Sequence, residues 1–175
     1  MVDTYKKLVE LHDCIKYDEL DKYKHKVWLL NTLDYLLCYD ERPDDLRAML
    51  FDIMQDLFPY NGNIYHGFIS YNTVYKVIQE FKGVLSYSFN LHEAYLYATS
   101  TDHMNTNALI MGYTDNGFNF YEFMLYLSNN FKEVAELFAG YKHEREILAY
   151  PMLYKVVENC LEKSVDDVRK ELGLC

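Results

Sequence analysis

The stretch VLSYSFNLHEAYLYA, residues 84–98, contains the change from strand to helix on which the expected fold depends. Its first six residues, Val84–Phe89, predict a short strand because polar and apolar side chains alternate through the Ser-Tyr-Ser-Phe run. Asn90 and Glu93 form a capping-box pattern, since each side chain can satisfy a backbone amide that the first helical turn leaves without a partner. The sequence therefore predicts a strand that leads directly into a helix over residues 91–98.

Another strand and helix are expected before this stretch, which gives the order strand, helix, strand, helix. Residues 64–68 resemble a strand that enters a turn at Gly67, and Ser70 can cap a helix that extends to Phe81. Turn-forming residues at 59–63 and 114–117 are expected to separate the regular elements. The other expected elements are helices over 4–15, 23–37 and 46–57, a strand over 108–113, a helix over 120–138 that Asn129-Asn130 could divide in two, a strand over 144–151 that ends at Pro151, and one or two helices over 152–172, the second opened by Ser164 and Asp167.

These elements predict an α+β protein in two parts. Residues 1–60 form a helical N-terminal region, and residues 61–175 form the mixed core with C-terminal helices. A chain of 175 residues that is 50% apolar and 17% aromatic can bury a substantial core, which excludes a disordered protein.

Charge and composition narrow the classes of function. The chain has 27 acidic and 17 basic residues, for a formal net charge of -10, which disfavours direct binding to nucleic acid. No run approaches the roughly 20 apolar residues of a membrane helix, and the polar start is unlike a secretory signal peptide. Four widely spaced cysteines favour a reducing compartment. We therefore expect a cytoplasmic protein without membrane contact.

Several common catalytic motifs are absent from the sequence. The glycines form neither a dinucleotide fingerprint nor a phosphate loop, and no Gly-x-Ser-x-Gly elbow is present. No two histidines have the i, i+4 spacing with which one helix face can hold a metal, so no metal site is predicted.

Three short segments remain, and their order is informative. They are Ile64-Tyr-His-Gly67, Leu85-Ser-Tyr-Ser-Phe89 and Glu144-Arg-Glu146. In order and character they resemble the motifs of the ADP-ribosyltransferase superfamily: Arg or His before Gly, a serine-rich turn ahead of an Ala-containing helix, and Gln/Glu-x-Glu on a later strand. The resemblance covers roughly residues 62–151. It implies a split-sheet core of the ADP-ribosyltransferase kind, NAD as a substrate, and transfer of ADP-ribose to a target protein.

The chemistry itself requires a fixed carboxylate. Breaking the bond between nicotinamide and ribose develops positive charge on the ribose, as in glycoside hydrolysis. If Glu144 and Glu146 lie on one strand, they point to the same side about 6.6 Å apart, from a rise of about 3.3 Å per residue. By resemblance, Glu146 hydrogen-bonds the nicotinamide ribose and stabilises the cation, and Glu144 faces the acceptor.

The resemblance also assigns residues that bind NAD. His66 would donate a hydrogen bond to the other ribose, and the backbone of Gly67 would approach the nicotinamide carboxamide. Ser86 would brace the site, with Ser88 as the alternative. The remaining candidates, for stacking on nicotinamide, are Tyr65, Tyr87 and Tyr97, for which ordinary core packing is the competing interpretation.

Two departures from the family pattern leave alternatives open. His66 stands where arginine-specific transferases have arginine, whereas Glu144 is typical of those same enzymes, and Tyr87 replaces a small residue. Small acidic members of the family resemble phage or toxin effectors that modify a host or defence protein. Hydrolysis of NAD is an alternative to transfer. The other class is an acidic, non-catalytic interaction protein that inhibits a nucleic-acid-binding partner.

Overall fold

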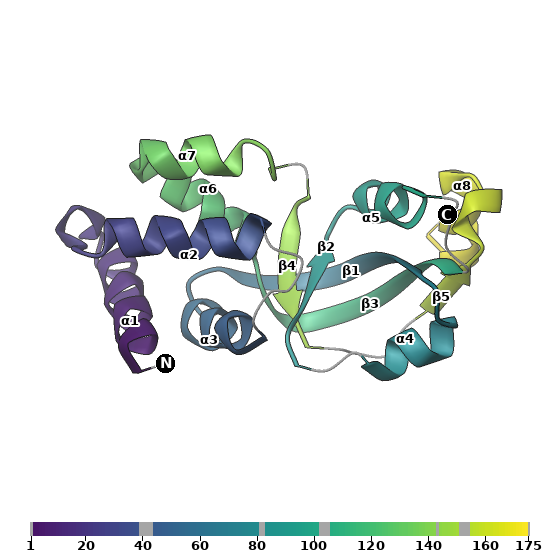
Figure 1. Cartoon of the computed structure of the whole chain (residues 1–175), viewed down its shortest axis with the longest axis horizontal. Coiled ribbons are helices and arrows are strands. Elements are labelled where there is room, and N and C mark those ends of the chain that lie inside the picture. The colour runs from purple at the N-terminus through teal and green to yellow at the C-terminus, as the bar shows by residue number, and fades with distance from the viewer. Residues whose placement is uncertain are drawn as a thin grey trace.

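The computed structural model describes residues 2–38, 44–80, 83–101, 106–142, 144–150 and 155–174 (Figure 1). Its helices are α1 (Val2–Lys16), α2 (Lys26–Cys38), α3 (Asp44–Met54), α4 (Val74–Glu80), α5 (Leu91–Ala98), α6 (Phe120–Asn130), α7 (Lys132–Phe138) and α8 (Val165–Leu172), with short 3-10 helices η1 (Leu20–Lys22) and η2 (Cys160–Glu162). Its strands are β1 (Pro59–Ser70), β2 (Leu85–Ser88), β3 (Thr106–Phe118), β4 (Glu146–Ala149) and β5 (Lys155–Glu158). The mixed α+β class is confirmed.

The sheet is antiparallel throughout, with strand order β1-β2-β4-β3-β5. The two long strands β1 and β3 pair along their whole length. Within the described part of the chain, β1 pairs with β2 at one position, Tyr65 with Ser88. A further pair, Phe118 with Leu148, connects β3 to β4. Strands β1, β2, β4 and β3 therefore form a ring, and β1 and β2 diverge beyond their single pair.

Helices cover both faces of the β1–β3 ribbon (Figure 1). On one face, α4 packs Val74 and Val77 against Phe68 of β1. On the opposite face, α5 and α8 pack with Tyr65 in a separate apolar cluster. Because neighbouring residues of a strand point to opposite faces, Tyr65 and His66 belong to different layers of the molecule.

The N-terminal helices share one apolar core with α6 and α7. Leu50 and Met54 of α3 are among its buried residues, and the core reaches the sheet at Phe118 and Leu148. The three helices expected before residue 60 are confirmed as α1, α2 and α3. The helical region is thus built onto the end of the ring where β3 and β4 meet (Figure 1).

Both expected turn strings are wrong as turns, because they lie inside β1 and β3 and pair with each other. Tyr60 pairs with Gly117, and Gly62 pairs with Thr114. Two steps along β1 therefore match three along β3, so β3 carries one extra residue in a β-bulge. Cross-strand pairing satisfies the backbone of residues whose local preference is for turns, and tertiary context overrides that preference.

The C-terminal segment also differs from the expectation of helix alone. Lys155–Glu158 forms β5 on the edge of β3, whereas residues 151–154, including the expected stop at Pro151, lie outside the described residues. Helix α8 is confirmed, and its capping box joins Ser164 to Asp167. Of the two alternatives for residues 120–138, the divided helix is the one observed, since α6 ends at Asn130 and α7 begins at Lys132.

Candidate functional site

The three motif segments lie on neighbouring strands. The Tyr-His-Gly segment belongs to β1, the Ser-Tyr-Ser segment to β2, and Glu146 begins β4. Tyr65 pairs with Ser88, and Ser88 pairs with Glu146, so these three residues form one row across the sheet. Residues paired in this way point to the same face, with Cβ atoms about 4.5–5.5 Å apart. The row brings the candidate carboxylate next to the serine segment.

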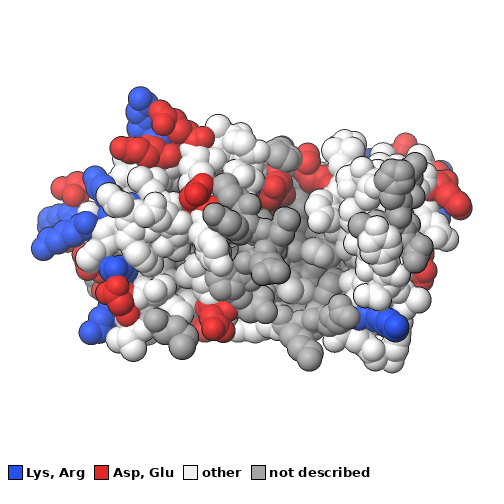
Figure 2. Space-filling view, viewed as in Figure 1, with Lys and Arg blue, Asp and Glu red and all other residues white. Residues whose placement is uncertain are grey.

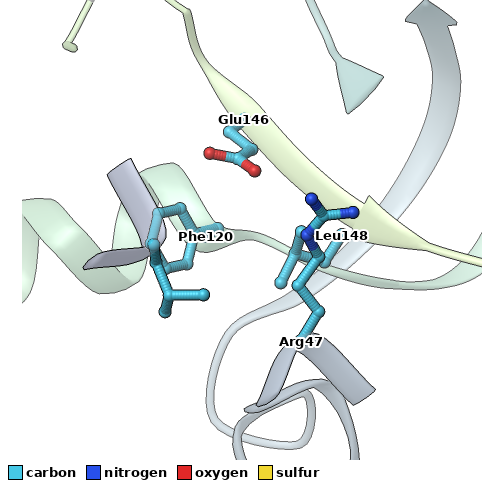
Figure 3. Close-up of a pocket in the computed structure, with 5 residues that line it drawn as sticks. Arg47, Phe120, Glu146 and Leu148 are labelled. Atoms are coloured by element: carbon cyan, nitrogen blue, oxygen red, sulfur yellow. The ribbon is translucent and has the colours of Figure 1, made fainter. Parts of the chain in front are cut away.

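Glu146 is a buried acid at the end of this row. It is 6% exposed and lines a cavity of about 10 Å³ together with Leu36, Arg47, Phe120 and Leu148. Figure 3 shows the carboxylate of Glu146 and the guanidinium group of Arg47 pointing toward the same space. A cavity of that volume holds about one water molecule. In this state the site next to Glu146 is therefore closed to a dinucleotide.

His66 lies on the other face of the sheet. Its ring stacks on Phe68 and meets Tyr87 edge-on, with centroids 6.4 and 5.7 Å away. Its Nδ1 lies 2.9 Å from the carbonyl oxygen of Ser86, and because a carbonyl only accepts, Nδ1 carries the proton. Burial lowers the pKa of His66 below 6.5, although this hydrogen bond opposes the shift. His66 is therefore neutral at pH 7, and its side chain does not converge with Glu146.

The tautomer changes the expected role of His66. With Nδ1 donating to Ser86 across the point where β1 and β2 diverge, Nε2 carries the lone pair of the neutral ring. A ribose hydroxyl would then donate to His66, instead of accepting from it as the family resemblance implied.

Gly67 is explained by helix packing. A Cβ at this position would lie 1.9 Å from the carbonyl oxygen of Ala94 and 2.9 Å from the backbone nitrogen of Ala98. Helix α5 thus rests directly on β1, and only glycine allows that approach. The space that a side chain of residue 67 would fill is occupied by helix α5. Helix packing therefore accounts for the glycine without the approach of a nicotinamide carboxamide.

The two candidate serines have different surroundings. Ser88 lies opposite Glu146, and its Oγ accepts a hydrogen bond from the backbone of Asn90, the N-cap of α5. Ser86 lies opposite Leu148, and its carbonyl oxygen accepts from His66. The register therefore places the alternative, Ser88, beside the carboxylate, while Ser86 contacts the histidine.

The three candidate tyrosines do not gather around one space. Tyr65 is buried beneath α5, and Tyr87 is buried inside the ring with Ile64 and Ile147. Tyr97, on α5, is 59% exposed. Tyr65 and Tyr87 thus have the positions of core aromatics, and Tyr97 is the one of the three that a ligand could reach.

Glu144 does not share a strand with Glu146. Strand β4 begins at Glu146, and Arg145 has a left-handed backbone with a φ of 51°. This conformation breaks the alternation that would set both carboxylates on one side. The expected 6.6 Å arrangement is therefore wrong: Glu144 is half-buried in the bend before β4, with its backbone nitrogen donating to Tyr141.

Arg47 is the site residue that motif analysis missed. It lies on α3, three residues before Leu50 and seven before Met54, both of which are buried. That spacing puts all three on one helix face. A cation on an apolar helix face requires a nearby anion, and this was the available signal in the sequence.

Charged side chains of both signs lie on the face drawn in Figure 2. On the face drawn in Figure 2, basic side chains lie at the two ends of the molecule, while acidic side chains also lie over its middle. No group of three or more His, Cys, Asp or Glu side chains in the described ranges could hold a metal ion. Among those same residues, no helix has the length and apolar character needed to cross a membrane.

Comparison with known proteins adds no further assignment. No protein-family model, curated protein or solved structure matches this chain.

Proposed function

We propose that the protein is a mono-ADP-ribosyltransferase that transfers ADP-ribose from NAD to a target protein. The observation that carries this proposal is the strand order. The His-Gly, Ser-Tyr-Ser and Glu segments are far apart in the sequence, yet they occupy the neighbouring strands β1, β2 and β4, with Ser88 directly opposite Glu146.

The reaction breaks one bond and forms another at the same carbon. The bond between C1′ of the ribose and the nicotinamide nitrogen breaks, and its electron pair leaves with nicotinamide. C1′ then carries positive charge, which the Glu146 carboxylate would stabilise through the ribose hydroxyl. A nucleophilic side chain of the target bonds to C1′ and loses its proton to solvent water, with Glu144 as the residue that faces the acceptor. Preorganised electrostatic contacts of this kind contribute about 10² to 10³ in rate.

The β1–β2 divergence supports the same proposal. Beyond the single Tyr65–Ser88 pair, the two strands separate, and the His66 side chain reaches across to the Ser86 carbonyl. NAD bound at this divergence would meet His66 from one face of the sheet and Glu146 from the other. The proposed site would thus form where the two strands cease to pair, instead of on one continuous face.

The closed cavity favours a second candidate function. A volume of about 10 Å³ next to Glu146 is far below the roughly 300 Å³ or more of typical ligand pockets. A non-catalytic protein with a net charge of -10 could instead engage a basic partner, such as a nucleic-acid-binding protein, through its surface. Such a protein would need no opening of the site.

Incubation with NAD and cell extract separates these functions. We expect mass spectrometry to find ADP-ribose on a defined extract protein after incubation with the wild type and with Glu136→Gln, a control at an exposed acid on α7. The Glu146→Gln variant should give no adduct. Free ADP-ribose without an adduct would indicate hydrolysis, and unchanged NAD would leave the interaction protein as the account.

A further inference from the structure

We infer that Arg47 is a positioning residue that orients the Glu146 carboxylate, and that the helical N-terminal region thereby completes the candidate site. The inference rests on the proposed function, and it adds a residue and a structural region that the three motifs do not include.

Five side chains from four elements surround the small cavity. Arg47 comes from α3, Leu36 from α2, Phe120 from α6, and Glu146 and Leu148 from β4. Three of the five are apolar, and Arg47 supplies the positive charge opposite the acid. In Figure 3 the two charged groups extend toward each other past the Phe120 ring. The sheet thus presents the acid, and the helical region presents the cation.

A carboxylate in these surroundings requires a compensating charge. Glu146 is 6% exposed, and removing an ionised carboxylate from water is costly unless a cation or hydrogen-bond donors replace the water. A guanidinium group suits this position because it is planar, always charged and able to meet both carboxylate oxygens at once. Arg47 therefore has the chemistry that compensates a carboxylate charge inside the apolar lining.

Orientation is the second part of the role. Glu146 is the first residue of β4, and Arg145 before it has a left-handed backbone. The carboxylate therefore lies at a strand end, where the backbone constrains a side chain less than in a strand interior.

The positive charge of Arg47 also acts on His66. Burial is the chief cause that lowers the pKa of His66, and the charge of Arg47 lowers that pKa further. Arg47 is thus electrostatically connected with motif residues on both faces of the sheet.

Kinetics of nicotinamide release separate positioning from substrate binding. We expect kcat to fall about 10²-fold in Arg47→Met, with KM changed by less than about threefold, because a preorganised electrostatic contact is lost. Arg47→Lys keeps the positive charge but lacks the planar guanidinium group, and its kcat should be at least about tenfold higher than that of Arg47→Met. Arg169→Met, at an exposed arginine on α8, should retain wild-type kinetics. Unchanged kcat, or a raised KM with unchanged kcat, would overturn the inference.

A double-mutant cycle tests the same contact without activity. Urea midpoints of wild type, Arg47→Met, Glu146→Gln and the double variant give the coupling between the two side chains. We expect Arg47→Met to lower the midpoint in the wild-type background at least twice as much as in the Glu146→Gln background. Equal shifts would overturn the inference. Coupling without any NAD turnover would support Arg47 as the partner of Glu146 and overturn the proposed function instead.

Discussion

The carbonyl oxygen of Ala94 lies 1.9 Å from the point at which a side chain on Gly67 would begin. Helix α5 is therefore seated on the backbone of β1, and its distance from the strand is set by the absence of one methyl group. The same helix buries Tyr65 and begins three residues after Ser88, so its position determines the arrangement of the candidate site.

Substituting Gly67 should strongly destabilise the fold. A methyl group there overlaps backbone atoms, which cannot move away as a flexible side chain could, so we expect Gly67→Ala to lower the free energy of unfolding by about 3 kcal/mol or more. Gly140→Ala is the matched control, because a Cβ at Gly140 would have no neighbouring atom within 4 Å. Urea unfolding of both variants checks this, and equal stabilities would contradict the packing described.

The half-buried His66 should make stability depend on pH. Its pKa is lowered chiefly by burial, so the unfolded chain, with a histidine pKa of about 6.5, binds protons more readily as the pH falls. Stability should therefore be retained above about pH 6.5 and decrease as the pH falls toward the lowered pKa. Urea midpoints between about pH 7.5 and about pH 5 measure this loss.

The His66→Asn variant isolates that contribution from those of the other histidines. Asparagine can still donate a hydrogen bond to the Ser86 carbonyl, but it does not titrate. We expect the loss of stability at low pH to be smaller in this variant than in the wild type. An identical pH profile would show that His66 is not the group responsible.

The two glutamates of the Glu-x-Glu segment should separate the two halves of the reaction. Glu144 lies in the bend before β4, whereas Glu146 lies in the strand row with Ser88. We expect Glu144→Gln to lose transfer to protein while it still releases nicotinamide, and Glu146→Gln to lose both by about 10² to 10³ in rate. Parallel assays of labelled protein and free nicotinamide give this comparison, and loss of nicotinamide release in Glu144→Gln would contradict the assigned roles.

The capping box of α8 should stabilise the layer over Tyr65. Ser164 Oγ accepts from the backbone of Asp167, and the Asp167 carboxylate accepts in return. Ser164→Ala should lower the free energy of unfolding by about 1 kcal/mol. The exposed Ser100→Ala should change it by less than about 0.5 kcal/mol. Thermal unfolding checks the difference, and equal effects would show that the cap contributes little.

Features set by a few neighbouring residues could be predicted from the sequence. The α8 cap depends on Ser164 and Asp167, and the break between α6 and α7 on Asn129-Asn130. The strand-to-helix unit at Asn90 formed as expected, although Asn90 accepts from His92 and not from Glu93. Such signals are local, so one stretch of sequence contains the whole interaction.

Features that depend on distant pairing could not be predicted. The turn-forming residues around Gly62 and Gly117 become strand because each segment provides the hydrogen-bond partners of the other. The strand over Lys155–Glu158 forms because β3 offers an open edge. Arg47 joined the candidate site only when α3 packed against β4, a contact between residues about one hundred positions apart. No short stretch of the sequence contains both partners of any of these contacts.

Release of nicotinamide from NAD by the purified protein, alone and with cell extract, tests the central proposal most directly. We predict that the wild type and the Glu136→Gln control release nicotinamide, and that the rate falls by about 10² to 10³ in Glu146→Gln. Urea unfolding of the Glu146→Gln variant checks that it is still folded. Release that is equal in Glu146→Gln and the wild type, or absent from the wild type in both conditions, would contradict the account.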